Sequence, residues 1–367
     1  MTSDWKSTTW GELAILEYGK GLTGYENANG NYPVYGTNGR IGWHTKPLFD
    51  KAGVIIGRKG AYRGVHYSKI PFFVIDTAFY LKPKIEIDLR WAYYQLLTQD
   101  INNMDSGSAI PSTSRPDFYA LRVKLPSLPE QRAIAGILGA LDDKIELNRR
   151  MNATLESMAR AVFRQWFVEG EDVGNYKIGR LADVAKVNER SITKEYPNSE
   201  IEYIDISSVA TGHLDGTTRY SLADAPSRAR RLVKHGDTIW STVRPNRKSF
   251  LFISKPKENL VVSTGFAVLT PTKIPPSFLY FWVTTDEFVD YLVSNADGSA
   301  YPAVLSERFA EAEMIMPPKE ILDRFENVAG SMLAHIAHNE NESRTLASLR
   351  DSLLPKLMRG EVRVSAL

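Results

Sequence analysis

A repeat at an offset of 191 residues constrains this sequence more than any other feature. Gly107-Ser108-Ala109-Ile110-Pro111 returns as Gly298-Ser299-Ala300-Tyr301-Pro302, and Thr154-Leu155-Glu156-Ser157 returns as Thr345-Leu346-Ala347-Ser348. Apolar residues between these segments also match without a gap, as Phe118 does with Phe309. A long match at this period indicates a tandem duplication and not a solenoid of small repeats. The expected order is domain, helix, domain, helix.

Two heptad patterns predict long helices over residues 129–167 and 320–358. Mainly apolar residues, with a few polar ones, recur there in steps of four and three, which is the spacing of a coiled-coil seam. The first seam comprises Ile134, Leu138, Leu141, Ile145, Asn148, Asn152, Leu155, Ala159, Val162 and Trp166. The second comprises Phe325, Ala329, Met332, Ile336, Asn339, Ser343, Leu346, Arg350 and Leu353. Each helix would be about 60 Å long at roughly 1.5 Å per residue.

The simplest way to cover both seams is to pair the helices with each other. Asn148 and Asn339 lie at the midpoints of the two predicted helices, so an antiparallel pair would bring them together. A polar pair in an apolar seam disfavours slipped registers. The alternative is that both Asn side chains lie at the edge of the seam in water. An antiparallel pair would also place the two domains at opposite ends of a helical spacer.

The two remaining blocks show the alternation and turn signals of β-rich domains. We therefore expect an α+β fold with two tandem globular α/β domains, separated by two long helices that pair as an antiparallel coiled coil. The expected blocks are domain 1 at 1–126, the central spacer helix at 127–169, domain 2 at 170–317 and the C-terminal spacer helix at 318–367.

Positive charge is concentrated within each domain, although the whole chain carries only +2. Residues 40–84 hold nine Lys or Arg against two acids, a net charge of +7. Residues 219–257 hold ten against two acids, a net charge of +8. Such stretches favour a polyanion-facing surface on each domain. Solvated loops balanced by acids elsewhere in the fold are an equally good interpretation of the charge alone.

Each domain contains a strand, a basic loop with small residues, and a returning strand. Arg can bond guanine in two places, Asn can do so with adenine, and small residues let the backbone approach DNA. Asn-Gly and Thr-Gly are also ordinary turn formers, so no single residue is assigned firmly. The candidate DNA-binding residues are Asn38, Arg40, Arg58, Lys59, Tyr62, Arg63, Ser108, Ser208, Arg230, Arg231, Thr242, Arg244, Asn246, Arg247, Lys248 and Ser299.

No pattern in the sequence indicates catalysis. The chain has no cysteine and lacks a phosphate-binding loop, a His-Glu-x-x-His motif and metal-ligand spacing among its six histidines. We expect no cofactor or metal in this chain. No signal peptide or bilayer-crossing apolar run is evident, which favours a cytoplasmic location.

Several segments resemble the specificity subunits of type I restriction–modification systems. The resemblance covers essentially the whole chain and is clearest in Leu125-Pro126-Ser127-Leu128-Pro129-Glu130-Gln131-Arg132, which is similar to the entry of that family's central helix. Leu141–Asn148, Phe163–Phe167 and Leu353–Glu361 are also similar to family segments. The second copy departs from the pattern, with Lys319-Glu320-Ile321 at the corresponding entry.

The resemblance implies that each domain reads one half of a bipartite double-stranded DNA target and that the helices set the gap. It also implies that two modification subunits, which carry S-adenosylmethionine, dock on this chain, and that restriction subunits join through the complex. A spacer of about 60 Å exceeds one turn of DNA, which favours separated half-sites. The alternatives are a stand-alone DNA-binding regulator and an enzyme with an unrecognised nuclease or methyltransferase site.

Overall fold

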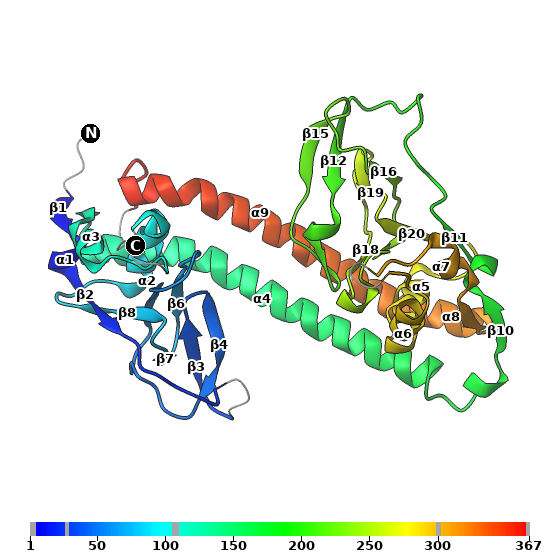
Figure 1. The fold of residues 1–367 in the computed structure, drawn as a ribbon, viewed down its shortest axis with the longest axis horizontal. Coiled ribbons are helices and arrows are strands. Elements are labelled where there is room, and N and C mark those ends of the chain that lie inside the picture. The colour runs from blue at the N-terminus through cyan, green and yellow to red at the C-terminus, as the bar shows by residue number, and fades with distance from the viewer. Residues whose placement is uncertain (1–4, 26–28, 105–109, 299–301, 365–367) are drawn as a thin grey trace. The chain divides into compact units, whose positions relative to one another are not determined.

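The computed structural model describes residues 5–25, 29–104, 110–298 and 302–364. Its internal contacts divide the chain into two units, with residues 1–147 and 342–367 in unit 1 and residues 148–341 in unit 2. Each unit therefore combines one globular domain with segments of both long helices (Figure 1). The four blocks expected from the sequence list helices and domains separately, and these contacts group each domain with the helical segments that pack against it.

Unit 1 contains two small sheets and a two-stranded ribbon. The larger sheet has the strand order β2-β8-β5-β6 and is antiparallel, and the smaller has the order β4-β3-β7 with β3 and β7 parallel. The ribbon pairs β1 with β9. The elements are β1 (Lys6–Thr9), α1 (Trp10–Leu13), β2 (Ala14–Tyr18), β3 (Tyr32–Gly36), β4 (Gly39–His44), β5 (Gly53–Gly57), β6 (Val65–Ser68), β7 (Phe73–Val74), β8 (Ala78–Pro83), α2 (Leu89–Leu97), α3 (Arg115–Ala120) and β9 (Arg122–Leu125).

Unit 2 repeats this plan with additions. Its sheets have the orders β11-β20-β17-β18 and β15-β12-β19-β16, and its ribbon pairs β10 with β21. The strands are β10 (Lys177–Arg180), β11 (Ala185–Val187), β12 (Glu200–Ile204), β13 (Val209–Ala210), β14 (His213–Leu214), β15 (Thr218–Ser221), β16 (Ala229–Leu232), β17 (Thr238–Ser241), β18 (Phe250–Phe252), β19 (Leu260–Ser263), β20 (Phe266–Pro271) and β21 (Glu313–Met316). The domain helices are α5 (Pro276–Val283), α6 (Asp286–Ser294) and α7 (Ser306–Glu311).

The matching topology confirms the internal duplication. α3 and β9 become α7 and β21 at the offset of 191, and the buried Phe118 falls on the buried Phe309. The parallel pair β3·β7 has its counterpart in the parallel pair β12·β19. Strand β16 and helix α6 extend the second copy beyond the common plan.

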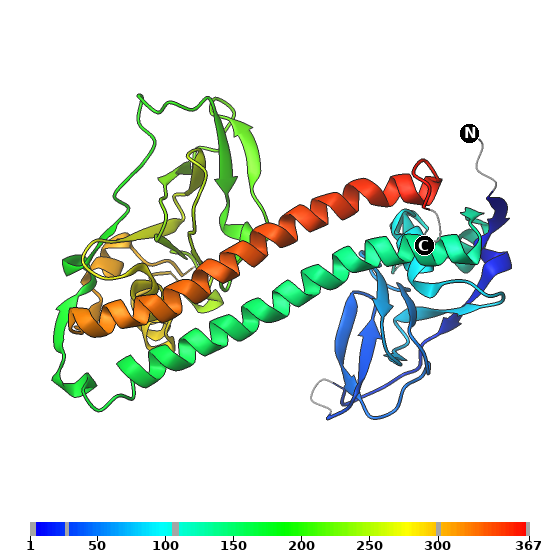
Figure 2. The same ribbon diagram turned by 180° about the vertical axis from the view of Figure 1, so that it is seen from behind.

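The two long helices begin and end close to the predicted residues. α4 is one continuous helix from Leu128 to Phe167, as Figure 2 also shows. Its repeat partner consists of α8 (Lys319–Phe325), a π-turn (Glu326–Gly330) and α9 (Ser331–Arg359). The sequence did not predict the π-turn. Here the Glu326 carboxylate accepts hydrogen bonds from the Ser277 main-chain N–H (3.1 Å) and hydroxyl (2.6 Å), which ties the turn to α5.

Segments of the two long helices run antiparallel within each unit. In unit 1 the Arg350 guanidinium donates to Asp142 (2.7 Å), and Lys144 lies 3.0 Å from Glu342 in an ion pair. In unit 2 the Asn152 side chain donates to the main-chain carbonyl of Ile336 (3.4 Å). A higher residue number on α4 thus faces a lower number on its partner, as antiparallel packing requires.

Asn148 and Asn339 come together as predicted, and both side chains are buried. Asn148 donates its side-chain amide to the main-chain carbonyl of Asn339 (3.3 Å). Asn339 in turn donates to the side-chain carbonyl of Asn152 (2.8 Å). The alternative of two Asn residues in water at the seam's edge is therefore wrong. Hydrogen bonding offsets the cost of burying these polar groups.

Each domain core is completed by residues of the long helices, some from the predicted seams and some adjacent to them. In unit 1, Ile134 and Leu138 of α4 and Leu357 of α9 share a core with Trp10 and Trp91. In unit 2, Phe163 and Phe167 of α4 pack with Phe325, and the rings of Phe167 and Phe325 meet nearly edge to face at 5.2 Å. Burying large apolar side chains typically contributes about 1.5–3 kcal/mol each. The helices are thus integral to the domains.

Candidate nucleic-acid interface

The two basic loops predicted from the sequence occupy equivalent places in the two units. Residues 58–64 connect β5 to β6, and residues 242–249 connect β17 to β18. Each of these strand pairs lies at one end of a four-stranded sheet of the same order. The predicted strand, basic loop and returning strand are therefore confirmed in both units.

A proline segment lies against each basic loop through the same pair of backbone hydrogen bonds. In unit 1, the N–H of Gly60 donates to the Pro111 carbonyl (2.9 Å) and the N–H of Thr113 donates to the Arg58 carbonyl (2.9 Å). In unit 2, the corresponding bonds run from Arg244 to Pro302 (2.7 Å) and from Val304 to Thr242 (2.8 Å). Pro111 and Pro302 belong to the segments whose sequence first revealed the repeat. The sequence did not predict that these segments meet the basic loops.

A threonine in a hairpin turn also contacts each basic loop; Thr37 lies between β3 and β4 in unit 1, and Thr211 lies between β13 and β14 in unit 2. The Thr37 hydroxyl donates to the main-chain carbonyl of Lys59 (2.8 Å), and the Thr211 hydroxyl donates to that of Lys248 (2.9 Å). These threonines belong to the Thr37-Asn38-Gly39 and Thr211-Gly212 segments, which have the composition of turns. In both units, two segments distant in sequence, the proline segment and the threonine turn, thus contact one basic loop.

The candidate side chains differ in their exposure. Those exposed to solvent are Asn38, Arg40, Lys59 and Tyr62 in unit 1 and Arg230, Asn246 and Arg247 in unit 2. Tyr62 projects furthest, with 80% of its surface exposed. Those that are half-buried are Arg58, Ser208, Arg231, Thr242, Arg244 and Lys248. Ser108 and Ser299 lie outside the described residues.

The prediction that Arg63 contacts DNA is corrected by its burial. Only 3% of Arg63 is exposed, and its guanidinium donates to the main-chain carbonyls of Gly60 (2.8 Å) and Asn102 (2.5 Å). Its own main-chain N–H donates to the Asn102 side chain (2.7 Å). Arg63 therefore fastens the basic loop to the segment after α2. A basic residue in a loop can serve the fold as well as a ligand, and the sequence does not separate the two roles.

Several half-buried candidates already have partners within the fold. The Lys248 ammonium donates to Asp286 (2.6 Å), and the hydroxyls of Thr242 and Ser208 donate to main-chain carbonyls. The Arg231 guanidinium lies 3.5 Å from the Ser191 hydroxyl, and burial lowers the pKa of Arg231. These contacts hold the side chains in place beside the exposed residues.

The basic loop of unit 2 holds two non-glycine residues in the left-handed backbone region. Arg244 has φ +51° and Lys248 has φ +53°, on either side of a 3₁₀ turn at Pro245–Arg247. Gly60, which is equivalent to Arg244 by its backbone bond, has φ +117°. Left-handed geometry costs a non-glycine residue about 1–2 kcal/mol. Strain of this kind is concentrated at functional sites.

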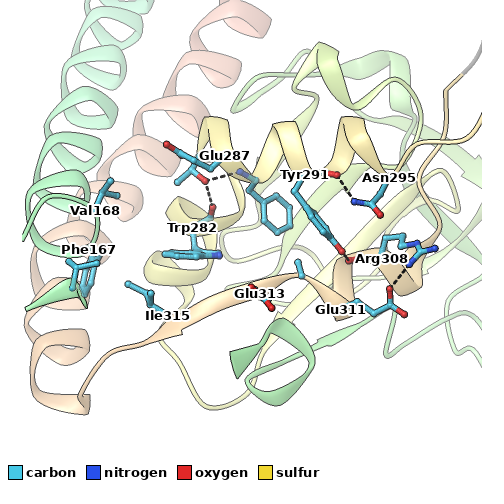
Figure 3. Close-up of a pocket in the computed structure, with 14 residues that line it drawn as sticks. Phe167, Val168, Trp282, Glu287, Tyr291, Asn295, Arg308, Glu311, Glu313 and Ile315 are labelled. Carbon is cyan, nitrogen blue, oxygen red and sulfur yellow. Dashed lines mark hydrogen bonds and ion pairs between the residues drawn. The ribbon is translucent and has the colours of Figure 1, made fainter. Parts of the chain in front are cut away.

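Two hollows in unit 2 adjoin the C-terminal part of α4. One has a volume of about 450 Å³ and is lined in part by Arg160 of α4 and by Thr211 and Lys248 of the loop cluster. The other, of about 620 Å³, is lined by the aromatic residues Phe167, Trp282, Phe288 and Tyr291 with acids at its edge (Figure 3). In this second hollow the Tyr291 hydroxyl donates to the Arg308 carbonyl (2.8 Å), and Arg308 pairs with Glu311 (2.8 Å).

Within the described ranges, no cluster of three or more His, Asp or Glu side chains is arranged to hold a metal ion. None of the helices in the same ranges is long and apolar enough to span a bilayer.

Comparison with known proteins agrees with this duplicated architecture. The family model described as the type I restriction modification DNA specificity domain matches residues 2–157. The MjaIX specificity subunit of Methanocaldococcus jannaschii is 22% identical over 353 residues, which cover 87% of this chain and 80% of the relative. The EcoDI specificity subunit of Escherichia coli is 23% identical over 405 residues, covering 98% and 89%.

A solved structure has the same fold. The S subunit of a type I restriction–modification system from M. genitalium matches with a TM-score of 0.69 at 18% identity, covering 97% of this chain and 96% of that chain. The fold and the two loop clusters define a class of internally duplicated proteins with one basic surface in each copy. In sequence, this chain is similar to the specificity subunits of type I restriction–modification systems.

Proposed function

We propose that this chain is the DNA sequence-recognition subunit of a type I restriction–modification enzyme, in which each unit reads one half of a bipartite target. The observation that carries the proposal is the repeated loop cluster. The same two backbone hydrogen bonds join a basic loop to a proline segment in both units, and in each unit a threonine hydroxyl also donates to a main-chain carbonyl of the loop. The side chains presented on this common frame differ, as Tyr62 in unit 1 and Asn246 in unit 2 do. Unlike side chains on like frames give unlike half-sites.

The exposed groups suit both parts of DNA recognition. Lys59, Arg40 and Arg247 supply positive charge for phosphates, and Asn38 and Asn246 supply the paired donor and acceptor that adenine matches. Arg40 lies over the Trp43 ring at 4.9 Å, which limits the freedom of its guanidinium. A restrained side chain loses less conformational entropy on binding.

The long helices act as the spacer and the docking surface. α4 contains 40 residues and would measure about 60 Å, more than one turn of DNA. Because the helices repeat, they offer two similar surfaces, which suit two copies of a modification subunit. In this proposal S-adenosylmethionine binds to the modification subunits, restriction subunits join through the complex, and this chain performs no chemistry itself.

Paired loop variants test the two-reader model. Lys59→Ala with Tyr62→Ala changes the exposed surface of unit 1 and spares Arg63, which the fold requires. Asn246→Ala with Arg247→Ala is the matched change in unit 2. We expect each pair to alter or weaken methylation at one half of the target and to leave the other half unchanged. Methylation mapping of cells carrying each variant with its modification subunit measures this. Loss of both halves in either variant would contradict separate readers.

A further inference from the structure

Unit 1 carries a group of three side chains beside its basic loop that the sequence analysis did not single out as a group. Tyr18 lies at the end of β2 with 48% of its surface exposed. The guanidinium carbon of Arg58 is 4.8 Å from the centre of the Tyr18 ring, and that of Arg115 is 5.1 Å from it. One exposed aromatic ring thus contacts two cations.

The fold brings these residues together from three segments. Tyr18 pairs with Phe79 where β2 meets β8. Arg58 is the first residue of the basic loop, and its Nη1 donates to the Asp76 carbonyl (2.8 Å). Arg115 begins α3 just after the segment that bonds to Arg58, and its Nη2 donates to the Tyr119 hydroxyl (3.0 Å). Each guanidinium group has five N–H donors, so these bonds anchor the groups and leave donors for a ligand.

The equivalent positions in unit 2 hold no cation. The shared backbone bonds make Thr242 the counterpart of Arg58, and the offset of 191 makes Ser306 the counterpart of Arg115. The register of β11 on β20 matches that of β2 on β8, with Ala185 on Pro271 as Ala14 is on Pro83. β11 ends at Val187, and Asn188 has φ +55°, so the strand ladder does not extend to a position equivalent to Tyr18. Two guanidinium groups in unit 1 are thus replaced by two hydroxyls in unit 2.

We propose that Arg58 and Arg115, which both lie against the Tyr18 ring, contact the phosphate backbone of the DNA in unit 1, and that unit 2 has no corresponding site. This inference rests on the proposed function. Arg is well suited to phosphate because its planar N–H groups match the phosphate oxygens. A phosphate contact positions the protein without reading a base. Through Arg58 and Arg115, unit 1 therefore binds the DNA backbone more strongly than the equivalent positions of unit 2 do.

The salt dependence of binding separates a phosphate contact from a purely structural role. We expect Arg115→Gln, in the full chain bound to its modification subunits, to weaken binding to the mapped target duplex roughly five-fold. We also expect the slope of log K against log salt concentration to fall in magnitude by about 0.9, the value for one lost phosphate contact. Arg115→Lys keeps the charge and should keep the slope. Arg58→Gln is a second variant with the same expected change in slope.

Arg122→Gln is the matched control. Arg122 is exposed in unit 1, but it lies in the β1–β9 ribbon, opposite Thr9, and outside the long helices. Its loss should leave the slope unchanged. Thermal unfolding of every variant checks the fold. An unchanged slope in both Arg115→Gln and Arg58→Gln, with wild-type protein binding DNA normally, would overturn the inference alone. A wild-type complex that binds no DNA would overturn the proposed function as well.

Discussion

The side-chain amide of Asn148 donates to the main-chain carbonyl of Asn339, its counterpart 191 residues further along the chain, across 3.3 Å. Neither side chain is more than 5% exposed. The bond joins the midpoints of two helices in a seam that is otherwise largely apolar. A register slip would bury both amides against apolar side chains, at a cost of about 1–3 kcal/mol for each unsatisfied group.

Replacing both residues by Leu should therefore allow the two helices to pair in slipped registers, without lowering the stability of the folded chain. We expect Asn148→Leu with Asn339→Leu to unfold at the same or a higher urea concentration than wild type. The chain has no cysteine, so disulfide crosslinks can form only between introduced cysteines, and each crosslink identifies the helix register. Lys144→Cys should crosslink to Glu342→Cys in the wild-type background and also to Leu349→Cys, one heptad away, in the Leu variant. A Leu variant that gives only the first product would show that the domains alone fix the register.

The spacer proposal predicts a fixed change in the target when both helices are lengthened together. Seven residues inserted beside Asn148 and seven beside Asn339 add about 10 Å to each helix. At 3.4 Å per base pair, the gap between half-sites should widen by about three base pairs. Methylation mapping reads the gap directly, and an insertion in α4 alone serves as the mismatched control. An unchanged gap with both half-sites intact would refute the spacer role.

The equivalent positions Gly60 and Arg244 should respond in opposite ways to substitution. Both lie in the left-handed backbone region, but only Gly adopts it without strain. We expect Gly60→Ala to lower the free energy of unfolding by about 1 kcal/mol and Arg244→Gly to raise it by about 0.5–1 kcal/mol. Arg244→Gly should also weaken DNA binding, because it removes a cation from the loop. Urea unfolding and DNA titration measure the two effects, and a destabilised Arg244→Gly would show that its side-chain contacts outweigh the strain.

Stability in acid should depend on the link between Asp143 of α4 and Arg90 of α2. The Arg90 guanidinium makes two hydrogen bonds to the Asp143 carboxylate (2.6 and 3.0 Å), and Lys69 adds a third (2.5 Å). Chiefly through Arg90, these bonds lower the pKa of Asp143 to about 2. A lowered pKa stabilises the fold above the unfolded value of about 3.9, and this stabilisation is lost as the pH falls toward 2.

Asp143→Asn should therefore cost stability near neutral pH and flatten the loss of stability between pH 4 and pH 2. Because the carboxylate is 45% exposed, the cost at pH 7 should not exceed about 1 kcal/mol. Urea unfolding of unit 1 at several pH values measures it. A variant that keeps the wild-type slope between pH 4 and pH 2 would show that other carboxylates dominate the acid transition.

The long helices were the part of the fold that the sequence predicted most completely. The heptad spacing and the repeat predicted α4 and its partner to within one residue at each end, apart from the π-turn at 326–330. Helical periodicity is a local property, so it is readable from one chain. The π-turn depends on how Glu326 meets Ser277 of α5, a contact between distant segments that no local pattern contains.

The sequence by itself determined the duplication, the equivalent positions of Asn148 and Asn339 and the place of both basic loops between strands, because each follows from spacing along the chain; the structure decided that the two Asn side chains are buried together. Only the tertiary structure decided which basic residues face solvent and which serve the fold. Arg63 and Lys59 belong to the same loop, yet Arg63 is held by backbone carbonyls while Lys59 is exposed. The Tyr18–Arg58–Arg115 group likewise arises because strand pairing and a backbone bond join three segments. A side chain's role depends on the neighbours that folding brings to it, and those neighbours are remote in sequence.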